Sequence, residues 1–143
     1  MPAIQPDAAS DFAGVVGLRD LSLGDGRSRC ALDIDRRHYN PNGVLHGGVT
    51  FTLTDVGMGS AVFSTLARGE RTTAMEVQVR FLRTVTGGSL TAESEIVSRR
   101  DRITTTKCEI RDGERRLVAI ATGTFYVSPA FATGPTEARP EQP

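Results

Sequence analysis

The apolar and polar positions follow different periods in different parts of this chain. Residues 47–67 contain one charged side chain, Asp55, and their apolar members fall on every side of a helical wheel. This pattern predicts one long helix that is buried all round. We expect it to open at Gly47 and to end near Ala67, with Gly69 as its C-cap.

Downstream of this helix, apolar and polar residues alternate strictly, which is typical of half-buried strands. Four such runs follow one another, at residues 75–81, 90–96, 104–111 and 117–127. Upstream, residues 29–34 alternate in the same way, and residues 12–23 indicate a short helical start running into a strand. Strands with one apolar face around one apolar helix predict an α+β fold with an antiparallel sheet wrapped around the helix.

The length of 143 residues fits a single domain. We expect this domain to span residues 12–127, after a flexible leader at 1–11 and before a Pro-rich disordered tail at 128–143. The first ten residues lack the basic and apolar regions of a signal peptide. The helix carries Asp55 and several hydroxyl residues, which disfavours a membrane span, so a cytoplasmic protein is expected.

The net charge and the cysteine and histidine content argue against several classes of function. The formal net charge is zero, which argues against nucleic acid and anionic membranes as partners. Cys30 and Cys108 lie in separate strand-like runs and are interpreted as free buried thiols. The two histidines, His38 and His46, have no clustered Cys or Asp beside them, so no metal site is predicted.

A motif crosses the start of the predicted helix. Asn40, Gly43, the run His46-Gly47-Gly48 and then Asp55 lead into a helix of small residues, and residues 75–83 follow as a strand. This arrangement resembles the hot-dog-fold acyl-CoA thioesterases of the phenylacetate-degradation and hydroxybenzoyl-CoA types. The resemblance implies hydrolysis of acyl- or aryl-CoA to free acid and CoA, with no cofactor apart from the CoA of the substrate. It also implies a homodimer, often a dimer of dimers.

Asp55 is the first candidate for catalysis. A carboxylate inside an apolar helix is costly unless it is paired, hydrogen-bonded or used. Two structural alternatives stay open, which are a surface position and a buried Asp bonded to neighbouring threonine hydroxyls. The resemblance implies a general base that activates water, or a nucleophile that forms a mixed anhydride, and the sequence leaves both possible.

The start of the helix offers bare backbone amides, which can hold a developing negative charge. By resemblance, the Gly47 amide polarises the thioester carbonyl, and Asn40 orients the water or the carbonyl. An Asx-turn is the structural alternative for Asn40. His46 is expected to organise the loop, and Gly48 to lie with it against the substrate.

Two further sets of substrate contacts follow from the resemblance. Many relatives carry Ser or Thr near the start of the strand after the helix, where it touches the catalytic water. Ala74 falls at this position with Thr73 beside it, and both are candidates. Arg80 and Arg83 are predicted to contact the CoA phosphates, with Arg99, Arg100 and Arg102 as further candidates.

The spacing of the two main candidates predicts a site built from two chains. Gly47 and Asp55 are eight residues apart, which is about 12 Å along a helix. A base and an oxyanion donor must flank one reacting carbon at roughly 3 Å. An antiparallel helix from a second subunit satisfies this requirement. Two alternatives to hydrolysis remain, a non-catalytic acyl-CoA-binding module and a hot-dog-fold hydratase or dehydratase.

Overall fold

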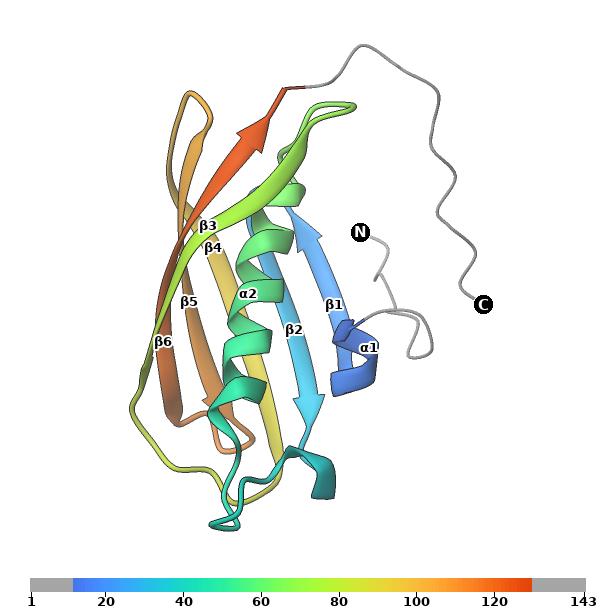
Figure 1. The fold of residues 1–143 in the computed structure, drawn as a ribbon, viewed down its shortest axis with the longest axis vertical. Coiled ribbons are helices and arrows are strands. Elements are labelled where there is room, and N and C mark those ends of the chain that lie inside the picture. Colours follow the sequence, from blue (N-terminus) through green and yellow to red (C-terminus); the bar gives the residue numbers. More distant parts are fainter. Residues whose placement is uncertain (1–11, 130–143) are drawn as a thin grey trace.

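One six-stranded antiparallel sheet and one long helix make up the fold in the computed structural model, which describes residues 12–129. In chain order the elements are α1 (Phe12–Val16), β1 (Leu18–Gly24), β2 (Arg27–Asp33), the 3-10 helix η1 (Arg36–His38), α2 (Gly47–Phe63), β3 (Arg71–Phe81), β4 (Ser89–Arg100), β5 (Ile103–Asp112) and β6 (Leu117–Ser128). The strand order is β1-β2-β4-β5-β6-β3, so β3 forms an edge beside the last strand (Figure 1).

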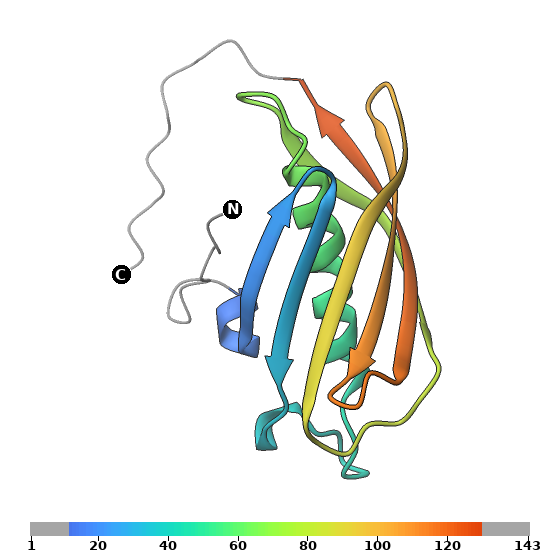
Figure 2. The same cartoon turned by 180° about the vertical axis from the view of Figure 1, so that it is seen from behind.

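The sheet curves around α2, as both sides of the molecule show (Figures 1 and 2). Alternate residues of the central strands face the helix and are buried, because a pleated strand points every second side chain to the same face. The helix and the sheet approach closely at Gly123, where a Cβ atom would lie 2.9 Å from the Cε atom of Met58. The expected fold, an antiparallel sheet wrapped around one central helix, is confirmed.

The helix is shorter than its apolar pattern predicts. It ends at Phe63 instead of near Ala67. The hydroxyls of Ser64 and Thr65 donate to the carbonyls of Ala61 and Val62 and so satisfy groups that another helical turn would have used. The prediction for residues 12–23, a short helical start running into a strand, is confirmed, because α1 leads directly into β1.

One side of the molecule is left uncovered by residues 12–129. Leu53, Met58 and Val62 of α2 are fully buried, whereas Phe51 and Phe63, which share one i, i+4 row of the helix with Asp55, are 42% and 57% exposed. Beside this face runs β3, an edge strand whose outer backbone groups have no neighbouring strand within residues 12–129. An apolar helix face next to an open strand edge is a surface that a partner can cover.

Strand β6 extends to Ser128, one residue into the predicted tail, while the leader 1–11 and residues 130–143 lie outside the described residues. Cys30 and Cys108 are free and buried, as predicted. No helix within residues 12–129 is both long and apolar enough to cross a membrane.

Candidate active site

The start of α2 leaves one backbone amide without a partner. His46 is the N-cap, and its Nδ1 atom accepts a hydrogen bond from the Gly48 N–H at 2.8 Å. The Val49 N–H donates to the His46 carbonyl at 3.0 Å. The Gly47 N–H has no acceptor within the described chain, because the first amides of a helix lack intrahelical partners. An unpaired amide at a helix N-terminus can stabilise an oxyanion.

The loop before the helix is held by Asn40. Its side-chain Oδ1 accepts from the Asn42 N–H at 2.9 Å and from the Val44 N–H at 3.3 Å. Gly43 adopts a φ of +75°, which favours glycine, and so lets the chain turn back for the Asn40 N–H to reach the Val44 carbonyl. The Asx-turn alternative therefore describes the Asn40 oxygen, while the Nδ2 amide has no acceptor within residues 12–129.

A cavity of about 310 Å³ opens beside Gly47. The tip of the Phe81 ring covers Gly47, since a Cβ atom on this glycine would lie 3.2 Å from the ring. Arg83 also lines the cavity, so the predicted contact of this arginine with an anionic substrate stays open. The remaining lining mixes apolar and hydroxyl side chains from the loop before α2, the helix start, the segment after β3 and the start of β6: Val44, Leu45, Thr50, Leu82, Thr84, Val85 and Val118.

Asp55 lies half-buried on the uncovered side of α2. Its carboxylate has no hydrogen-bond or ion-pair partner within the described chain, and burial raises the pKa of this group above its ordinary value of 3.8. The hydroxyls of Thr52 and Thr54 donate to the carbonyls of Gly48 and Phe51 instead. The alternative of a structural Asp bonded to threonine hydroxyls is therefore wrong.

The Gly47 amide and the Asp55 carboxylate lie at different positions along the axis of α2. The rise from Gly47 to Asp55 is about 12 Å, and Asp55 is absent from the cavity that Gly47 lines. One chain thus brings Gly47, Gly48, His46 and Arg83 to the same end of the helix and leaves the carboxylate two turns away.

The register of β3 places Thr73 and Ala74, the two candidates near its start, on opposite faces of the sheet. Ala74 lies opposite buried Phe125 and belongs to the inner face, whereas Thr73 lies opposite exposed Tyr126 on the outer face. The substrate contact predicted for Thr73 has no support in this register, because one residue along a strand reverses the side-chain direction. The inner position next to Val127 is held by Thr72, whose buried Oγ1 has no hydrogen-bond partner.

The other arginines predicted to contact substrate lie on the outer face of the sheet or pair with a carboxylate of the chain. Arg80 lies opposite Ile120 on the outer face of β3, away from Gly47, which does not support its predicted contact with substrate at this cavity. The side chains of Arg99 and Arg102 form ion pairs with Glu70 at 3.7 and 2.7 Å. These two arginines tie the β4–β5 hairpin to the loop after α2, so a carboxylate of the same chain already matches part of their charge.

A larger hollow of about 660 Å³ lies over the outer face of β2, β4 and β5. Its wall contains ion pairs of Glu95 with Arg27 and Lys107, so its charges are largely neutralised within the chain. It holds none of the residues that the motif singles out, and we therefore place the candidate site at Gly47. The described residues contain no cluster of three or more His, Cys, Asp or Glu that could hold a metal ion.

The pattern of the sequence did not reveal two neighbours of the site. The alternation at residues 75–81 predicts a strand that ends at Phe81, but the position of Phe81 over Gly47 depends on how this strand crosses the helix. His38 lies next to the motif in sequence, but nothing in its neighbours signals that its ring is buried.

Comparison with known proteins decides the family. A family model described as the thioesterase superfamily matches residues 42–119, which include both Gly47 and Asp55. The chain belongs to the thioesterase superfamily. The resemblance to hot-dog-fold thioesterases is thereby confirmed, and hydrolysis of thioesters or esters is the general activity that this membership supports.

Solved structures agree with this membership. A conserved protein of Pseudomonas aeruginosa is 32% identical with a TM-score of 0.78, over 83% of this chain and 94% of its own. A phenylacetic acid degradation protein of Thermus thermophilus is 26% identical with a TM-score of 0.74, over 80% of this chain and 96% of its own. A thioesterase of Haemophilus influenzae, 24% identical with a TM-score of 0.79 over 85% of each chain, shares the fold.

Proposed function

We propose that this thioesterase-superfamily protein hydrolyses acyl- or aryl-CoA thioesters to a free acid and CoA. One observation carries the proposal: a single helix offers a free amide at Gly47 and an unpaired, desolvated carboxylate at Asp55. The cavity beside Gly47 is lined by apolar side chains together with Thr50, Thr84 and Arg83, a mixed lining that suits the arm of CoA. CoA enters as part of the substrate, and the chemistry requires no other cofactor.

The proposed reaction needs a donor for the oxyanion and an acceptor for a proton. The Gly47 N–H binds the thioester oxygen as negative charge develops on it. Asp55 takes a proton from water while the water oxygen bonds to the carbonyl carbon. The tetrahedral intermediate then expels the CoA thiolate, which is protonated as the acid leaves. The raised pKa makes Asp55 a stronger base than an ordinary aspartate.

A second route uses Asp55 as the nucleophile. Its carboxylate oxygen attacks the carbonyl carbon and forms a mixed anhydride as the CoA thiolate departs. Water then hydrolyses the anhydride and returns the free carboxylate. Both routes need the same two groups around one carbon, so the geometry of the site is common to them.

This geometry requires a second copy of the chain, and we propose a homodimer, with a dimer of dimers as a further assembly. A two-fold axis beside α2 sets the helices antiparallel and brings Asp55 of one protomer opposite Gly47 of the other. The uncovered apolar face at Phe51 and Phe63 and the open edge of β3 support this contact. Such a dimer contains two equivalent sites.

The test is free-thiol release from a panel of aliphatic and aromatic acyl-CoAs, with the parent chain and Asp55→Asn. We expect the parent to release CoA and Asp55→Asn to be slower by about 10²-fold or more, the scale for losing a positioned base or nucleophile. The matched control is Asp25→Asn, an exposed turn position with a φ of +51° that Asn also tolerates. This control should keep full activity.

The outcomes separate the alternatives. An Asp55→Asn chain that stays within about threefold of the parent would show that Asp55 is not the reacting group. Tight binding of acyl-CoA with no thiol release from the parent would indicate a binding module. Water addition to an enoyl-CoA without thiol release would indicate a hydratase.

A further inference from the structure

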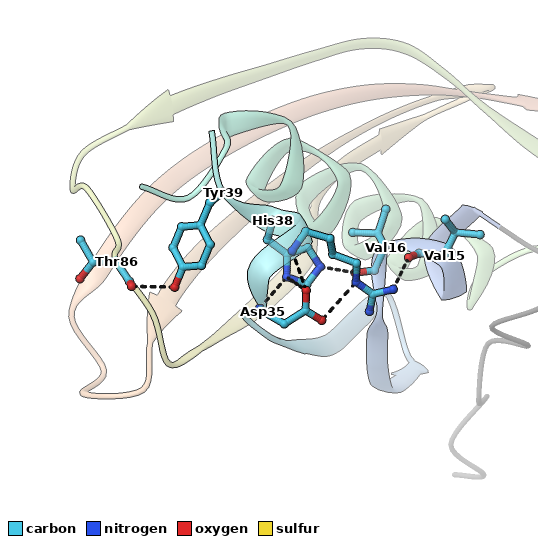
Figure 3. A network of polar contacts seen from close by, with 7 residues as sticks. Val15, Val16, Asp35, His38, Tyr39 and Thr86 are labelled. Atoms are coloured by element: carbon cyan, nitrogen blue, oxygen red, sulfur yellow. Dashed lines mark hydrogen bonds and ion pairs between the residues drawn. The ribbon is translucent and has the colours of Figure 1, made fainter. Parts of the chain in front are cut away.

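His38 has a buried imidazole for which the sequence offers no role. The residue is 3% exposed and lies at the end of η1, between the loop that leads to α2 and the last turn of α1 (Figure 3). A buried histidine usually has hydrogen-bond partners for both nitrogens, so those partners show what the ring holds together.

Both ring nitrogens bond to backbone groups. Nδ1 accepts from the Asp35 N–H at 2.9 Å, and because it faces a donor it carries no proton. Nε2 therefore bears the proton and donates to the Val16 carbonyl at 2.6 Å. The first bond is half of a capping box that shapes η1, and the second fastens η1 to the end of α1 (Figure 3).

The backbone of His38 continues this attachment toward the active site. Its carbonyl accepts from the His46 N–H at 2.8 Å. The His46 ring in turn accepts the Gly48 N–H, which leaves the Gly47 amide as the free one. Two hydrogen bonds thus connect His38 to the Gly48 amide, which is the neighbour of the Gly47 amide proposed to bind the oxyanion. Asn40 is only two residues further along the same loop.

We propose that His38 is a positioning residue that fixes the start of α2 and the Asn40 loop by anchoring both to α1. The proposal rests on the proposed thioesterase function. His38 does not touch the substrate cavity, whose lining does not include it. Its effect is on the geometry of the Gly47 amide, and geometry at an oxyanion donor matters more for turnover than for binding.

The experiment compares His38→Ala, His38→Gln and Arg37→Ala. Arg37 is the matched control because its guanidinium donates to the Val15 carbonyl at 3.1 Å and so fastens the same turn of α1 from the exposed side. Removing it loosens α1 but leaves both bonds of the imidazole. Gln at position 38 can still accept the Asp35 N–H, as Gln does in a capping box, but loses the bond to Val16.

Steady-state kinetics with the best acyl-CoA should show a loss in kcat. We expect His38→Ala to lose about tenfold or more in kcat with KM within about threefold, and His38→Gln to lose clearly less. Arg37→Ala should stay within about twofold of the parent at a temperature well below its melting point. A loss confined to KM, or an equal loss in Arg37→Ala, would overturn the proposal.

A second readout does not depend on activity. Hydrogen–deuterium exchange at the Gly48 amide should be about tenfold faster in His38→Ala than in Arg37→Ala, because the His46 cap loosens. If the parent releases no CoA, the proposed function fails, and unchanged Gly48 exchange would separately overturn the role of His38. If His38→Ala does not fold, full kcat and parental exchange in His38→Gln would also overturn it.

Discussion

At the scale of single residues, the environments of the carboxylates set Asp55 apart. In Asp33 and Glu95, hydrogen bonds from Arg19 and Lys107 hold the pKa below its usual value. Asp55 has no such partner in the described part of the chain, and burial alone raises its pKa. A carboxylate kept without a cation costs the fold free energy, which is common where a group serves function rather than stability.

Replacing Asp55 by Asn should therefore stabilise the protein at neutral pH. The folded-state pKa of Asp55 lies above the unfolded value, so ionisation disfavours the folded state once the pH rises through these values. The amide that replaces the carboxylate has no charge to desolvate. We expect Asp55→Asn to melt above the parent at pH 7, with the difference shrinking as the pH falls below the ordinary value of 3.8.

Asp33→Asn is the control, for which we expect the opposite change in melting temperature at pH 7. The pKa of Asp33 is lowered by Arg19, so its charge favours the folded state above the unfolded pKa, and its loss should lower the melting temperature slightly at pH 7. Thermal melts of the three chains across pH make the comparison. A lower melting temperature for Asp55→Asn at pH 7 would mean that Asp55 has a stabilising partner.

At the scale of elements, the sequence predicts what depends on periodicity. The helix, the four strands after it and the sheet around it all follow from apolar spacing, and Gly47 and Asp55 stand out because they interrupt that spacing. The predicted helix end near Ala67 is wrong, because the hydroxyls of Ser64 and Thr65 compete for backbone groups through contacts that apolar spacing does not show.

Features that depend on register or on contacts between distant segments were beyond the sequence. A bulge between Ala74 and Glu76 decides which residues of β3 face inward, and single-residue offsets are invisible in alternation. The pairing of Arg99 and Arg102 with Glu70 joins segments about 30 residues apart in the chain. Composition alone left these arginines as candidates for phosphate.

The start of α2 gives a prediction that separates the Gly47 amide from the space around it. Gly47→Ala keeps the N–H but places a methyl 3.2 Å from the Phe81 ring, so we expect a moderate loss of turnover. Gly47→Pro removes the N–H, suits the first helical turn and follows a residue in the required extended conformation. We expect it to lose at least 10²-fold.

Phe81→Leu tests the steric part of this argument. It should restore most of the turnover of Gly47→Ala, because the smaller side chain clears the methyl group, and should restore none in Gly47→Pro. The measurement is the initial rate of thiol release by the parent, by Gly47→Ala and Gly47→Pro, and by the two double variants that add Phe81→Leu to each. Equal rescue of both variants would identify crowding, rather than the amide, as the reason glycine is needed.

At the scale of the whole molecule, the proposed site is split between two protomers. Each chain has its Gly47 amide at one end of α2 and its Asp55 carboxylate about 12 Å along the helix. The row of α2 that carries Asp55 also carries Phe51 and Phe63, which residues 12–129 leave exposed. Activity and association are therefore expected to depend on each other.

Two inactive chains should accordingly complement each other. Asp55→Asn and Gly47→Pro chains, refolded together, form mixed dimers with one intact site and one site that lacks both groups. With random pairing, about a quarter of the parental activity should return. Each variant refolded alone should stay inactive.

The mixed dimers can be confirmed with two different affinity tags. If they form and no activity returns, Asp55 and Gly47 serve the same chain's site and the two-chain arrangement is wrong. Activity in proportion to the fraction of mixed dimers would support the arrangement.

The order of the elements along the chain has a consequence for biosynthesis. The apolar helix α2 precedes β3, β4, β5 and β6, which cover it. At 5–20 residues per second, a ribosome needs roughly 3 to 13 seconds to make the rest of the sheet. During this interval the described elements that can shield the helix are α1 and the β1–β2 hairpin. The emerging polypeptide is therefore a natural substrate for chaperones, and a ribosome that stalls before β4 leaves an aggregation-prone fragment.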